Sequence, residues 1–242
     1  MSLDHIPEEP TGPRYALIVL QTDETLEGDM RRLLPPDARV HVTRIAMERD
    51  VSPDTLAAMG PNIAAAAALL PSGPYDAVGY GCTSGTAVIG RAAVASAVRE
   101  GCDAGRVTDP LSALVDTCKA HGITRLGVVS PYVAAVNDQL VAALARENID
   151  VAHLDTFDVA DDRDVVRIDG TSLERAARAM AARDVEAVFL SCTNLRTLDV
   201  IERLGDLNLP VWSSNLLIAR SLMQPEGDAS NGPLTRRGRS AS

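Results

Sequence analysis

Short apolar runs bounded by polar or turn-forming residues recur along the chain, and a stretch that can form a helix follows most of them. Runs of this length are typical of buried strands, and strands that alternate with helices are typical of a parallel sheet. The pattern predicts strands near 15–20, 39–45, 76–81, 126–130, 151–157, 186–191 and 210–212. It predicts helices near 26–34, 51–70, 83–100, 111–121, 134–147, 172–182, 198–204 and 216–223. The expected fold class is therefore α/β.

One strand-and-turn pattern occurs twice. Residues 76–85 and 186–194 each contain an acidic residue, an apolar run, a Cys-Thr pair and a small polar residue. Cys82 and Cys192 are 110 residues apart, and the same offset aligns the run 15–20 with a second apolar run. We interpret this as a duplicated unit, with two pseudo-symmetric, open parallel-sheet α/β halves that face each other across an active-site cleft.

The duplication sets the expected domain organisation. The first half spans 14–109, the second spans 110–211, and a closing segment, 212–223, is expected to pack back on the first half. The two ends of the chain, 1–13 and 224–242, are polar and rich in proline, glycine or charged residues. We expect both ends to be disordered tails.

The charge of the chain narrows the kinds of partner. A formal net charge of −10 and a pI near 4.8 argue against nucleic acid and anionic membranes, because both require a basic face. No apolar run approaches the roughly 18 residues of a membrane span, and residues 1–13 lack a hydrophobic signal core. We therefore expect a cytoplasmic protein that binds a small molecule, and a homo-oligomer is left open.

The cysteines and histidines do not suggest a metal site or a disulfide framework. The spacing of the four cysteines contains no CxxC, and the four histidines fall on different elements without a common site. Glycines around the first cysteine are spaced G-x-G-x-x-x-G, whereas the dinucleotide fingerprint is G-x-G-x-x-G. We expect no metal and no organic cofactor.

Cys82 and Cys192 are the candidate catalytic pair, because each is expected on the turn at the carboxyl end of a strand, where open α/β sheets bind ligands. The alternative is a pair of buried structural thiols. A helix N-terminus after each cysteine is expected to lower the thiol pKa and to supply free N–H donors. The polar neighbours that are candidate substrate-binding residues are Thr83, Ser84, Thr193 and Asn194.

Two further candidates follow the first strand of each half. Asp23 is expected at the rim of the cleft, either as a substrate-binding group or as a capping carboxylate for the helix near 26–34. Tyr132 is expected on the equivalent loop, where a phenol can donate a hydrogen bond to a carboxylate.

Other polar or reactive stretches carry weaker signals. Residues 213–215, Ser-Ser-Asn, end the last strand and are another rim candidate. Cys118 falls within a helix and is expected in the core. The charged run 161–164 is expected on a solvated surface.

Two thiols on opposite sides of a flat carbon centre support two kinds of reaction. A thiolate can remove a proton from one face while the other thiol returns a proton to the opposite face, which inverts the centre. Alternatively, one thiolate adds to an activated double bond, the resulting single bond rotates, and the thiolate leaves. Neither reaction requires a cofactor.

The motifs that contain these residues resemble the aspartate/glutamate racemase superfamily. The resemblance spans about residues 15–223 and rests on VLQTDET (19–25), GYGCTSG (79–85), SPY (130–132) and LSCTNLRTLD (190–199). The branch that the chain looks most like contains maleate cis-trans isomerase, arylmalonate decarboxylase and the racemase-like protein of ectoine-utilisation clusters. Arylmalonate decarboxylases resemble the chain but keep only the second cysteine, so the pair counts against decarboxylation.

The resemblance to maleate isomerases implies a nucleophile, a second acid or base, and a hydrogen-bond donor to the substrate, which are Cys82, Cys192 and Tyr132 in that order. It also exposes a departure, since Asp23 and Asp162 stand where maleate isomerases have asparagines that hold the substrate carboxylates. A carboxylate repels a carboxylate unless one of them is protonated, which disfavours a plain dicarboxylate. The stretch 19–25 looks closest to the ectoine-utilisation branch, whose context implies amino-acid-like substrates.

The sequence therefore predicts a cofactor-independent racemase, epimerase or isomerase of a small carboxylate or amino-acid-like substrate. Within enzymes the alternative is maleate cis-trans isomerase, which converts maleate to fumarate. From another class, the alternative is a non-catalytic small-molecule binding protein of the same fold, although neither cysteine has been lost. A thiol redox protein would require the two sulfurs to approach disulfide distance.

Overall fold

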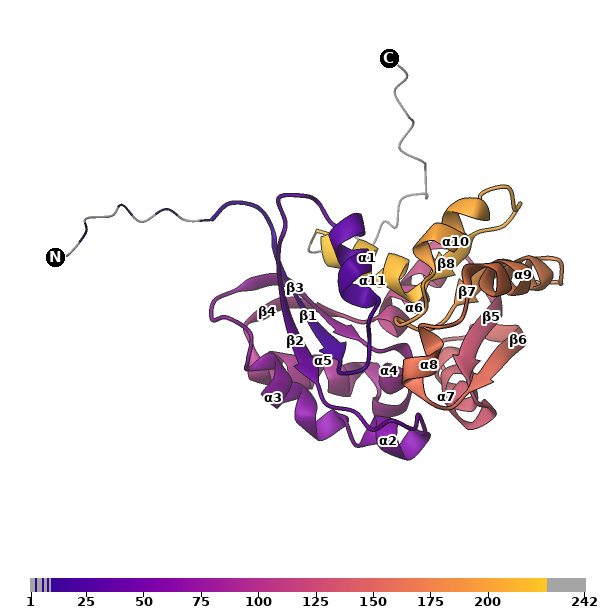
Figure 1. The fold of residues 1–242 in the computed structure, drawn as a ribbon, viewed down its shortest axis with the longest axis horizontal. Helices are drawn as coiled ribbons and strands as arrows, with labels where there is room; N and C mark the ends of the chain where they lie inside the picture. The colour runs from indigo at the N-terminus through magenta and orange to yellow at the C-terminus, as the bar shows by residue number, and fades with distance from the viewer. Residues whose placement is uncertain (1–2, 4–5, 7, 9, 226–242) are drawn as a thin grey trace, which may run out of the picture.

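The computed structural model describes residues 3, 6, 8 and 10–225. The chain forms two parallel β-sheets with helices packed around them, which confirms the predicted α/β fold of two open-sheet halves (Figure 1). Of the predicted disordered tails, 1–13 and 224–242, residues 1–2, 4–5, 7, 9 and 226–242 lie outside the described residues.

Each sheet has four strands, and every pairing is parallel. The first sheet contains, in spatial order, β2 (Arg39–Ile45), β1 (Arg14–Leu20), β3 (Tyr75–Gly81) and β4 (Ala104–Thr108). The second sheet contains β6 (Asp150–Val159), β5 (Arg125–Tyr132), β7 (Ala187–Leu190) and β8 (Val211–Ser213). The second sheet thus repeats the strand order of the first.

Helices connect the strands in both halves. Around the first sheet they are α1 (Leu26–Leu33), α2 (Pro53–Ala57), the 3-10 helix η1 (Gly60–Asn62), α3 (Ile63–Ala67), α4 (Thr83–Ile89) and α5 (Arg91–Gly101). The helix α6 (Pro110–His121) leads from β4 to β5. The later helices are α7 (Ala134–Ala145), α8 (Asp162–Val165), α9 (Gly170–Ala181), α10 (Leu198–Arg203) and α11 (Ser214–Met223).

Two predicted helices are broken in the structure. The helix expected over 51–70 divides into α2, η1 and α3, because Pro61 has no N–H to donate to the preceding turn. The helix expected over 83–100 divides into α4 and α5 at Gly90, whose φ of +94° is accessible to glycine. The strand β4 was not predicted, since its five residues include a glycine and an arginine and lack a continuous apolar run.

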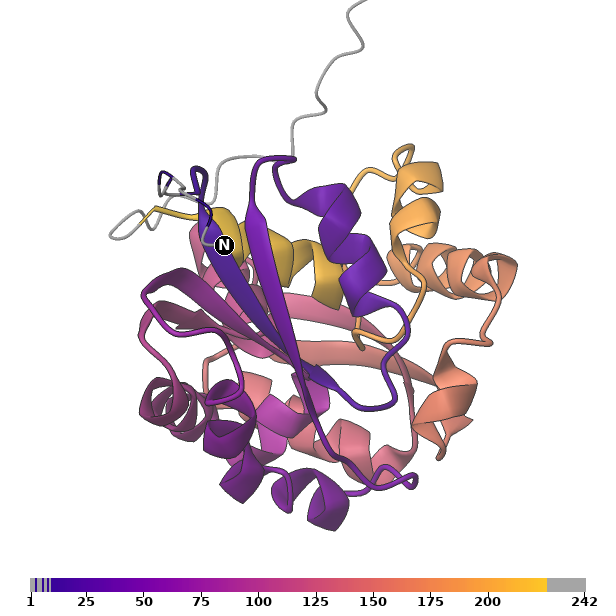
Figure 2. The same ribbon diagram turned by 60° about the vertical axis from the view of Figure 1, so that its left-hand side comes forward.

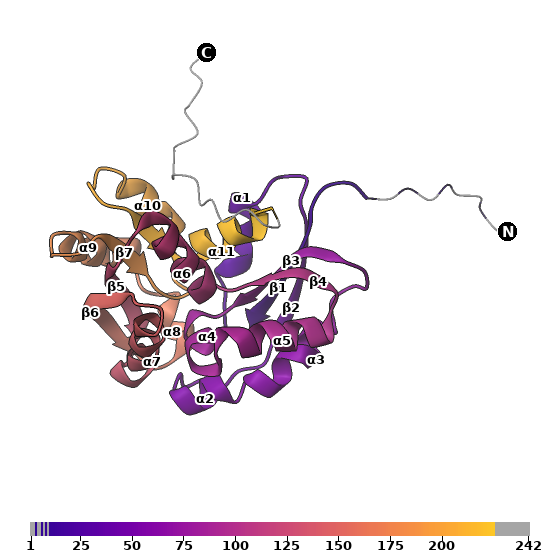
Figure 3. The same ribbon diagram turned by 180° about the vertical axis from the view of Figure 1, so that it is seen from behind.

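The apolar runs form the core of each half. Ala16, Leu17, Ile18 and Val19 of β1 are all fully buried, as expected for a parallel strand covered on both faces. The final helix, α11, packs beside α1 on the first half, as Figure 2 shows, and its Ile218 joins the same apolar cluster as Leu17. On the other side of the molecule, α4 of the first half contacts α7 of the second (Figure 3). The two halves therefore share contacts on both sides of the cysteine turns.

Two features are absent from the part of the chain that the structure describes. Its helices are all too short or too polar to cross a bilayer. Nor do its His, Cys, Asp and Glu side chains form a group of three that could hold a metal ion.

Candidate active site

Cys82 lies between the end of β3 and the start of α4, as the sequence predicts. Its side chain is buried, and its Sγ accepts a hydrogen bond from the Gly85 N–H at 3.1 Å. Burial nevertheless raises the pKa of Cys82 from 9.0 to about 12, because loss of water around the sulfur outweighs the single N–H donor. The expectation of a lowered thiol pKa is therefore wrong.

Cys192 follows β7 but does not begin a helix, because α10 starts only at Leu198. Its φ of +136° lies in a region that strains any residue with a side chain. Its Sγ accepts a hydrogen bond from the Asn194 N–H at 3.3 Å and lies 3.1 Å from the Tyr132 hydroxyl oxygen. Burial, followed by the charge of Asp162, raises the pKa of Cys192 well above its ordinary value. A tight turn thus replaces the predicted helix N-terminus at the second cysteine.

The hydroxyl of Ser214 joins the two cysteine turns. It accepts a hydrogen bond from the Cys192 N–H at 3.0 Å and bonds to the Thr83 hydroxyl, next to Cys82, at 2.9 Å. Ser214 is fully buried at the start of α11. The two turns therefore lie next to each other. The sequence marks 213–215 as a rim candidate but gives no sign of this connecting role.

Tyr132 and Asp162 form a buried hydrogen-bonded pair beside the second cysteine. The Tyr132 hydroxyl donates to Asp162 Oδ1 at 2.6 Å. The other carboxylate oxygen, Oδ2, accepts from the Thr22 hydroxyl at 2.6 Å and from the Asn194 amide at 3.3 Å. Asp162 is fully buried, so the prediction of a solvated surface for 161–164 is wrong at this residue. Its side chain turns inward because three donors satisfy the carboxylate there.

Asp23 has the capping role, which is one of the two roles weighed from the sequence. Its Oδ1 accepts the N–H groups of Thr25 and Leu26 at 2.8 Å each and so caps the start of α1. Its Oδ2 has no hydrogen-bond partner within the described residues, and the nearby Thr193 hydroxyl donates instead to the Gly81 carbonyl at 3.1 Å. Burial raises the pKa of Asp23 from 3.8 to about 6. One oxygen of a buried carboxylate is thus unpaired among the described residues, and a substrate-binding role for Asp23 stays a prediction.

The other predicted binding residues are buried in the same region. The four side chains, each at most 4% exposed, are Thr83, Ser84, Thr193 and Asn194. The side-chain amide of Asn194 is held at both ends, since Oδ1 accepts the Glu24 N–H at 2.9 Å and Nδ2 donates to the Asp162 carbonyl at 3.0 Å. This amide is therefore already engaged with the protein, and a substrate-binding role for the four residues stays a prediction.

Tyr80 is a site neighbour that the sequence reasoning missed. It is fully buried, and its hydroxyl has no hydrogen-bond partner within the described residues. A Cβ placed on Gly85 would meet this hydroxyl at 3.0 Å and Cys82 Sγ at 2.9 Å, so the phenol lies close to the first cysteine. The available signal was strand alternation, because residues two apart on β3 point to the same face.

A surface cleft of about 690 Å³ lies next to Thr22 and Asp23. Three arginines also line it, namely Arg44, Arg49 and Arg163. The cleft reaches from solvent to the edge of the buried site. Arg44 is ion-paired with Glu27 and Arg163 with Asp161, and Glu24 also lines the cleft, so the opening carries charges of both signs.

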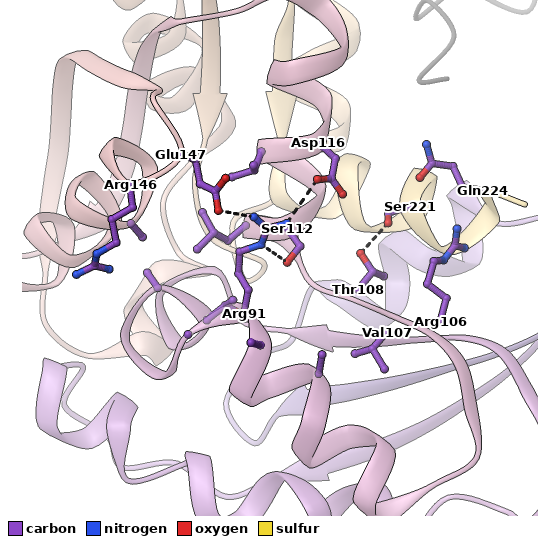
Figure 4. Close-up of a pocket in the computed structure, with 18 residues that line it drawn as sticks. Arg91, Arg106, Val107, Thr108, Ser112, Asp116, Arg146, Glu147, Ser221 and Gln224 are labelled. Atoms are coloured by element: carbon purple, nitrogen blue, oxygen red, sulfur yellow. Dashed lines mark hydrogen bonds and ion pairs between the residues drawn. The ribbon is translucent and has the colours of Figure 1, made fainter. Parts of the chain in front are cut away.

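Another cleft, of about 640 Å³, lies away from the cysteines, between α5 and α6 (Figure 4). Its central cation, Arg91, donates to Ser112 Oγ at 2.9 Å and to Glu147 Oε1 at 2.8 Å, and lies 3.5 Å from Asp116 Oδ1. None of the predicted site residues lines this cleft. The Arg91 guanidinium is already paired with acidic side chains. We do not assign it to the active site.

Residues 33–228, which are most of the chain, match the model of the arylmalonate decarboxylase family. The chain belongs to the arylmalonate decarboxylase family. Both cysteine turns, α8 and Tyr132, which ends β5 instead of lying on the predicted loop, are within the matched segment. The prediction of an isomerase-like enzyme is confirmed by this membership together with relatives named as maleate isomerases.

The relatives match along most of their length. The maleate isomerase of Nocardia farcinica is 28% identical over 226 residues, which cover 87% of this chain and 89% of that protein. The maleate isomerase of Alcaligenes faecalis is 25% identical over 218 residues, which cover 83% of this chain and 86% of that protein.

Solved structures show the same fold. One is a cysteine-to-serine variant of the Nocardia farcinica maleate cis-trans isomerase with a covalently bound succinylcysteine intermediate; its TM-score is 0.78 at 28% identity, covering 87% of this chain and 91% of that chain. The maleate isomerase Iso of Pseudomonas putida S16 has a TM-score of 0.76 at 22% identity, covering 87% of this chain and 90% of that chain.

Proposed function

We propose that this family member is a cofactor-independent isomerase that inverts a carbon centre or isomerises a double bond in a small carboxylate, with Cys82 and Cys192 as its catalytic pair. The observation that carries the proposal is the joining of the two buried cysteine turns by Ser214. The charge of Asp162 also acts on both thiols and raises the pKa of each, after burial as the main cause. Purely structural thiols have no need of an alcohol, a phenol and a carboxylate around them.

In inversion, the Cys82 thiolate removes the proton from the carbon next to the substrate carboxylate, and the Cys192 thiol gives its proton to the opposite face. One S–H bond forms as the other breaks, so a turnover leaves the proton on Cys82, and exchange with water resets the pair. Backbone N–H groups of the cysteine turns are the donors available to the anion formed on the way. The burial that raises both thiol pKas also makes each thiolate a strong base toward carbon.

Asp23 favours a substrate that carries an ammonium group. Above its raised pKa of about 6, caused by burial, the carboxylate is ionised, and no group in the described part of the chain donates a hydrogen bond to its Oδ2. An ammonium about 4 Å away, at an effective dielectric constant of about 20, gains on the order of 4 kcal/mol of Coulomb energy before desolvation is subtracted. The stretch 19–25, which contains Asp23, also carries the resemblance to the racemase-like protein of ectoine-utilisation clusters. An amino-acid-like substrate follows from both arguments.

Maleate cis-trans isomerisation is the second candidate. It is favoured by the Nocardia farcinica relative, whose variant structure holds a covalently bound succinylcysteine. Here the Cys82 thiolate would form a C–S bond with one carbon of the double bond, the new single bond would rotate, and cleavage of the C–S bond would release fumarate. An ionised Asp23 would repel a maleate carboxylate placed against its Oδ2.

A proton-exchange screen in heavy water tests the proposal. Small amino acids and dicarboxylic acids are incubated with the protein, and NMR detects deuterium at the inverted carbon or conversion of maleate to fumarate. Cys82→Ala and Cys192→Ala should each abolish the reaction while leaving the fold intact. Cys102→Ala should leave the reaction unchanged. The proposal fails if no compound reacts, or if the reaction survives the loss of either catalytic cysteine.

Asp23→Asn distinguishes the two candidates. Loss of the charge should lower kcat/KM for an amine-bearing substrate and raise it for maleate. Equal kcat/KM values for Asp23→Asn and the unchanged protein, on every reactive compound, would show that Asp23 is only a helix cap.

A non-catalytic binding protein of the same fold is the alternative from another class. It predicts that a small carboxylate binds in calorimetry but exchanges no proton in heavy water. The cytoplasmic location and the oligomeric state stay predictions from the sequence.

A further inference from the structure

Asp162 has no free oxygen for a ligand, unlike Asp23. Its Oδ1 receives the Tyr132 hydroxyl, and its Oδ2 receives the Thr22 hydroxyl and the Asn194 amide. The side chain is fully buried. The resemblance to maleate isomerases implies contact with a substrate carboxylate at this position. The observed hydrogen bonds connect the side chain to the tyrosine beside the second cysteine instead.

Counting protons sets the direction of these hydrogen bonds. A carboxylate only accepts, and a phenol has one proton to donate. The Tyr132 oxygen is 2.6 Å from Asp162 Oδ1 and 3.1 Å from Cys192 Sγ, so the shorter, charge-assisted bond takes the phenolic proton. The phenol oxygen then faces the sulfur with a lone pair. A hydrogen bond between them forms only when Cys192 carries a proton.

We propose that Asp162 is a positioning residue that acts through Tyr132 to keep Cys192 the more firmly protonated thiol of the cysteine pair. Cys192 is then the acid of the resting site, and Cys82 is the base or nucleophile. The meaning of this assignment for catalysis rests on the proposed function. The location of the proton is a property of the protein alone and is measured without a substrate.

The surroundings of the two sulfurs differ in the direction that this assignment requires. Cys82 Sγ receives the Gly85 N–H at 3.1 Å, a donor that favours a thiolate. Cys192 Sγ receives the Asn194 N–H at a longer 3.3 Å. Burial is the main cause of the raised pKa of both thiols, and the charge of Asp162 comes next for Cys192, whereas for Cys82 it ranks below the Gly85 N–H. The other charged groups that raise these pKas are Asp23, for both thiols, and Asp109, for Cys82. Hydrogen bonds from Tyr132 and from the Asn194 N–H act the other way and lower the pKa of Cys192. The Tyr132 contribution requires the phenol to donate to the sulfur, which it does not do while its proton is given to Asp162.

Alkylation by iodoacetamide at about pH 9, read separately for Cys82 and Cys192 by mass spectrometry, tests the assignment, because the thiolate is the reactive form. The ratio of the two rates cancels any opening of the site that both reactions need. Asp162→Asn removes the charge whichever way the amide turns, so the pKa of Cys192 should fall. The charge also raises the pKa of Cys82, so the ratio reports the difference between the two falls. A fall at Cys192 that exceeds the fall at Cys82 by one pKa unit increases the rate at Cys192 about tenfold relative to Cys82.

Tyr132→Phe tests the direction of the bond to the sulfur. If the phenol accepts from Cys192, its removal takes away a bond that only the thiol makes, and the relative rate at Cys192 rises. If the phenol donates to the sulfur, its removal lowers that rate and overturns the proposal. The effect of the double variant with Asp162→Asn should be smaller than the sum of the single effects, because both act through one chain of hydrogen bonds.

Asp164→Asn is the matched control, since Asp164 lies on the same short helix but is exposed. It should leave the ratio unchanged. An unchanged ratio in Asp162→Asn, or an equal change in Asp164→Asn, overturns the proposal. Tyr132→Phe decides the question alone if Asp162→Asn does not fold. If the ratio changes as expected but no substrate reacts in the heavy-water screen, the proposed function fails and the positioning role stands.

Discussion

Replacing Asp23 by asparagine should change how the stability of the fold depends on pH. Burial raises the pKa of Asp23 from 3.8 to about 6, so the folded protein holds a proton that the unfolded chain releases. At about 1.4 kcal/mol per pKa unit, the ionised carboxyl costs the folded state about 3 kcal/mol. Because the folded pKa is the raised one, this cost is absent below about pH 3, grows between the unfolded pKa of 3.8 and the folded pKa of about 6, and is complete above about pH 7.

The asparagine variant removes this cost but keeps the cap. Its side-chain oxygen can accept the same N–H groups of Thr25 and Leu26, and asparagine is as good a helix cap as aspartate. The free energy of unfolding of Asp23→Asn, relative to the unchanged protein, should therefore increase by about 2 kcal/mol between pH 4 and pH 8. A penalty for the unpaired amide would be the same at every pH and would not affect this difference.

Urea unfolding followed by the fluorescence of the single tryptophan, Trp212, measures the difference at intervals from about pH 4 to pH 8. Trp212 is fully buried and reports on the second sheet. Asp103→Asn, which changes an exposed carboxyl, should show no such trend. A difference for Asp23→Asn that stays constant with pH, or that grows toward acid, would show that this carboxyl is not desolvated in the folded protein.

Three other predictions concern the cysteines and their support. Ser214→Ala leaves the buried Cys192 N–H without its acceptor and should lower the free energy of unfolding by about 1–3 kcal/mol in urea titrations, more than the part-buried Ser221→Ala does. Cys192→Gly relieves the strain at φ +136° and should be about 1 kcal/mol more stable than Cys192→Ala; equal urea midpoints would contradict this. Cys118→Ala, in the core, should lower the free energy of unfolding by about 1–2 kcal/mol. Cys118→Ala and Cys102→Ala should both leave turnover unchanged, and a loss of activity in either variant would revise the choice of catalytic pair.

Much of the fold was predictable because the chain repeats itself. The apolar runs of β1, β3, β5 and β7 are continuous and buried on both faces, and the 110-residue offset between Cys82 and Cys192 relates the halves. The break at Gly90 was not predictable with the same ease, since an isolated glycine inside a helical pattern is often tolerated. Its positive φ depends on how α4 and α5 pack.

The candidate site was predictable where a residue follows a strand. Cys82, Asp23 and Tyr132 were found in this way, and the structure brings them into one buried region. Asp162 was misplaced on the surface because its burial depends on partners far away in the sequence. Thr22, one of its hydrogen-bond donors, is 140 residues distant. A local charged run carries no information about such a partner.

A raised thiol pKa does not by itself distinguish a catalytic cysteine in this protein. Burial also raises the pKa of Cys118 to about 12, yet this side chain lies in an apolar cluster with Leu114 and Trp212. At Cys192 the same cost of burial coincides with a strained φ, and the neighbouring Asp23 adds a carboxylate oxygen without a partner. Each of these features destabilises the folded chain, and none improves packing. Their occurrence together at one place supports the proposed active site, because strain and unpaired polar groups persist where function requires them.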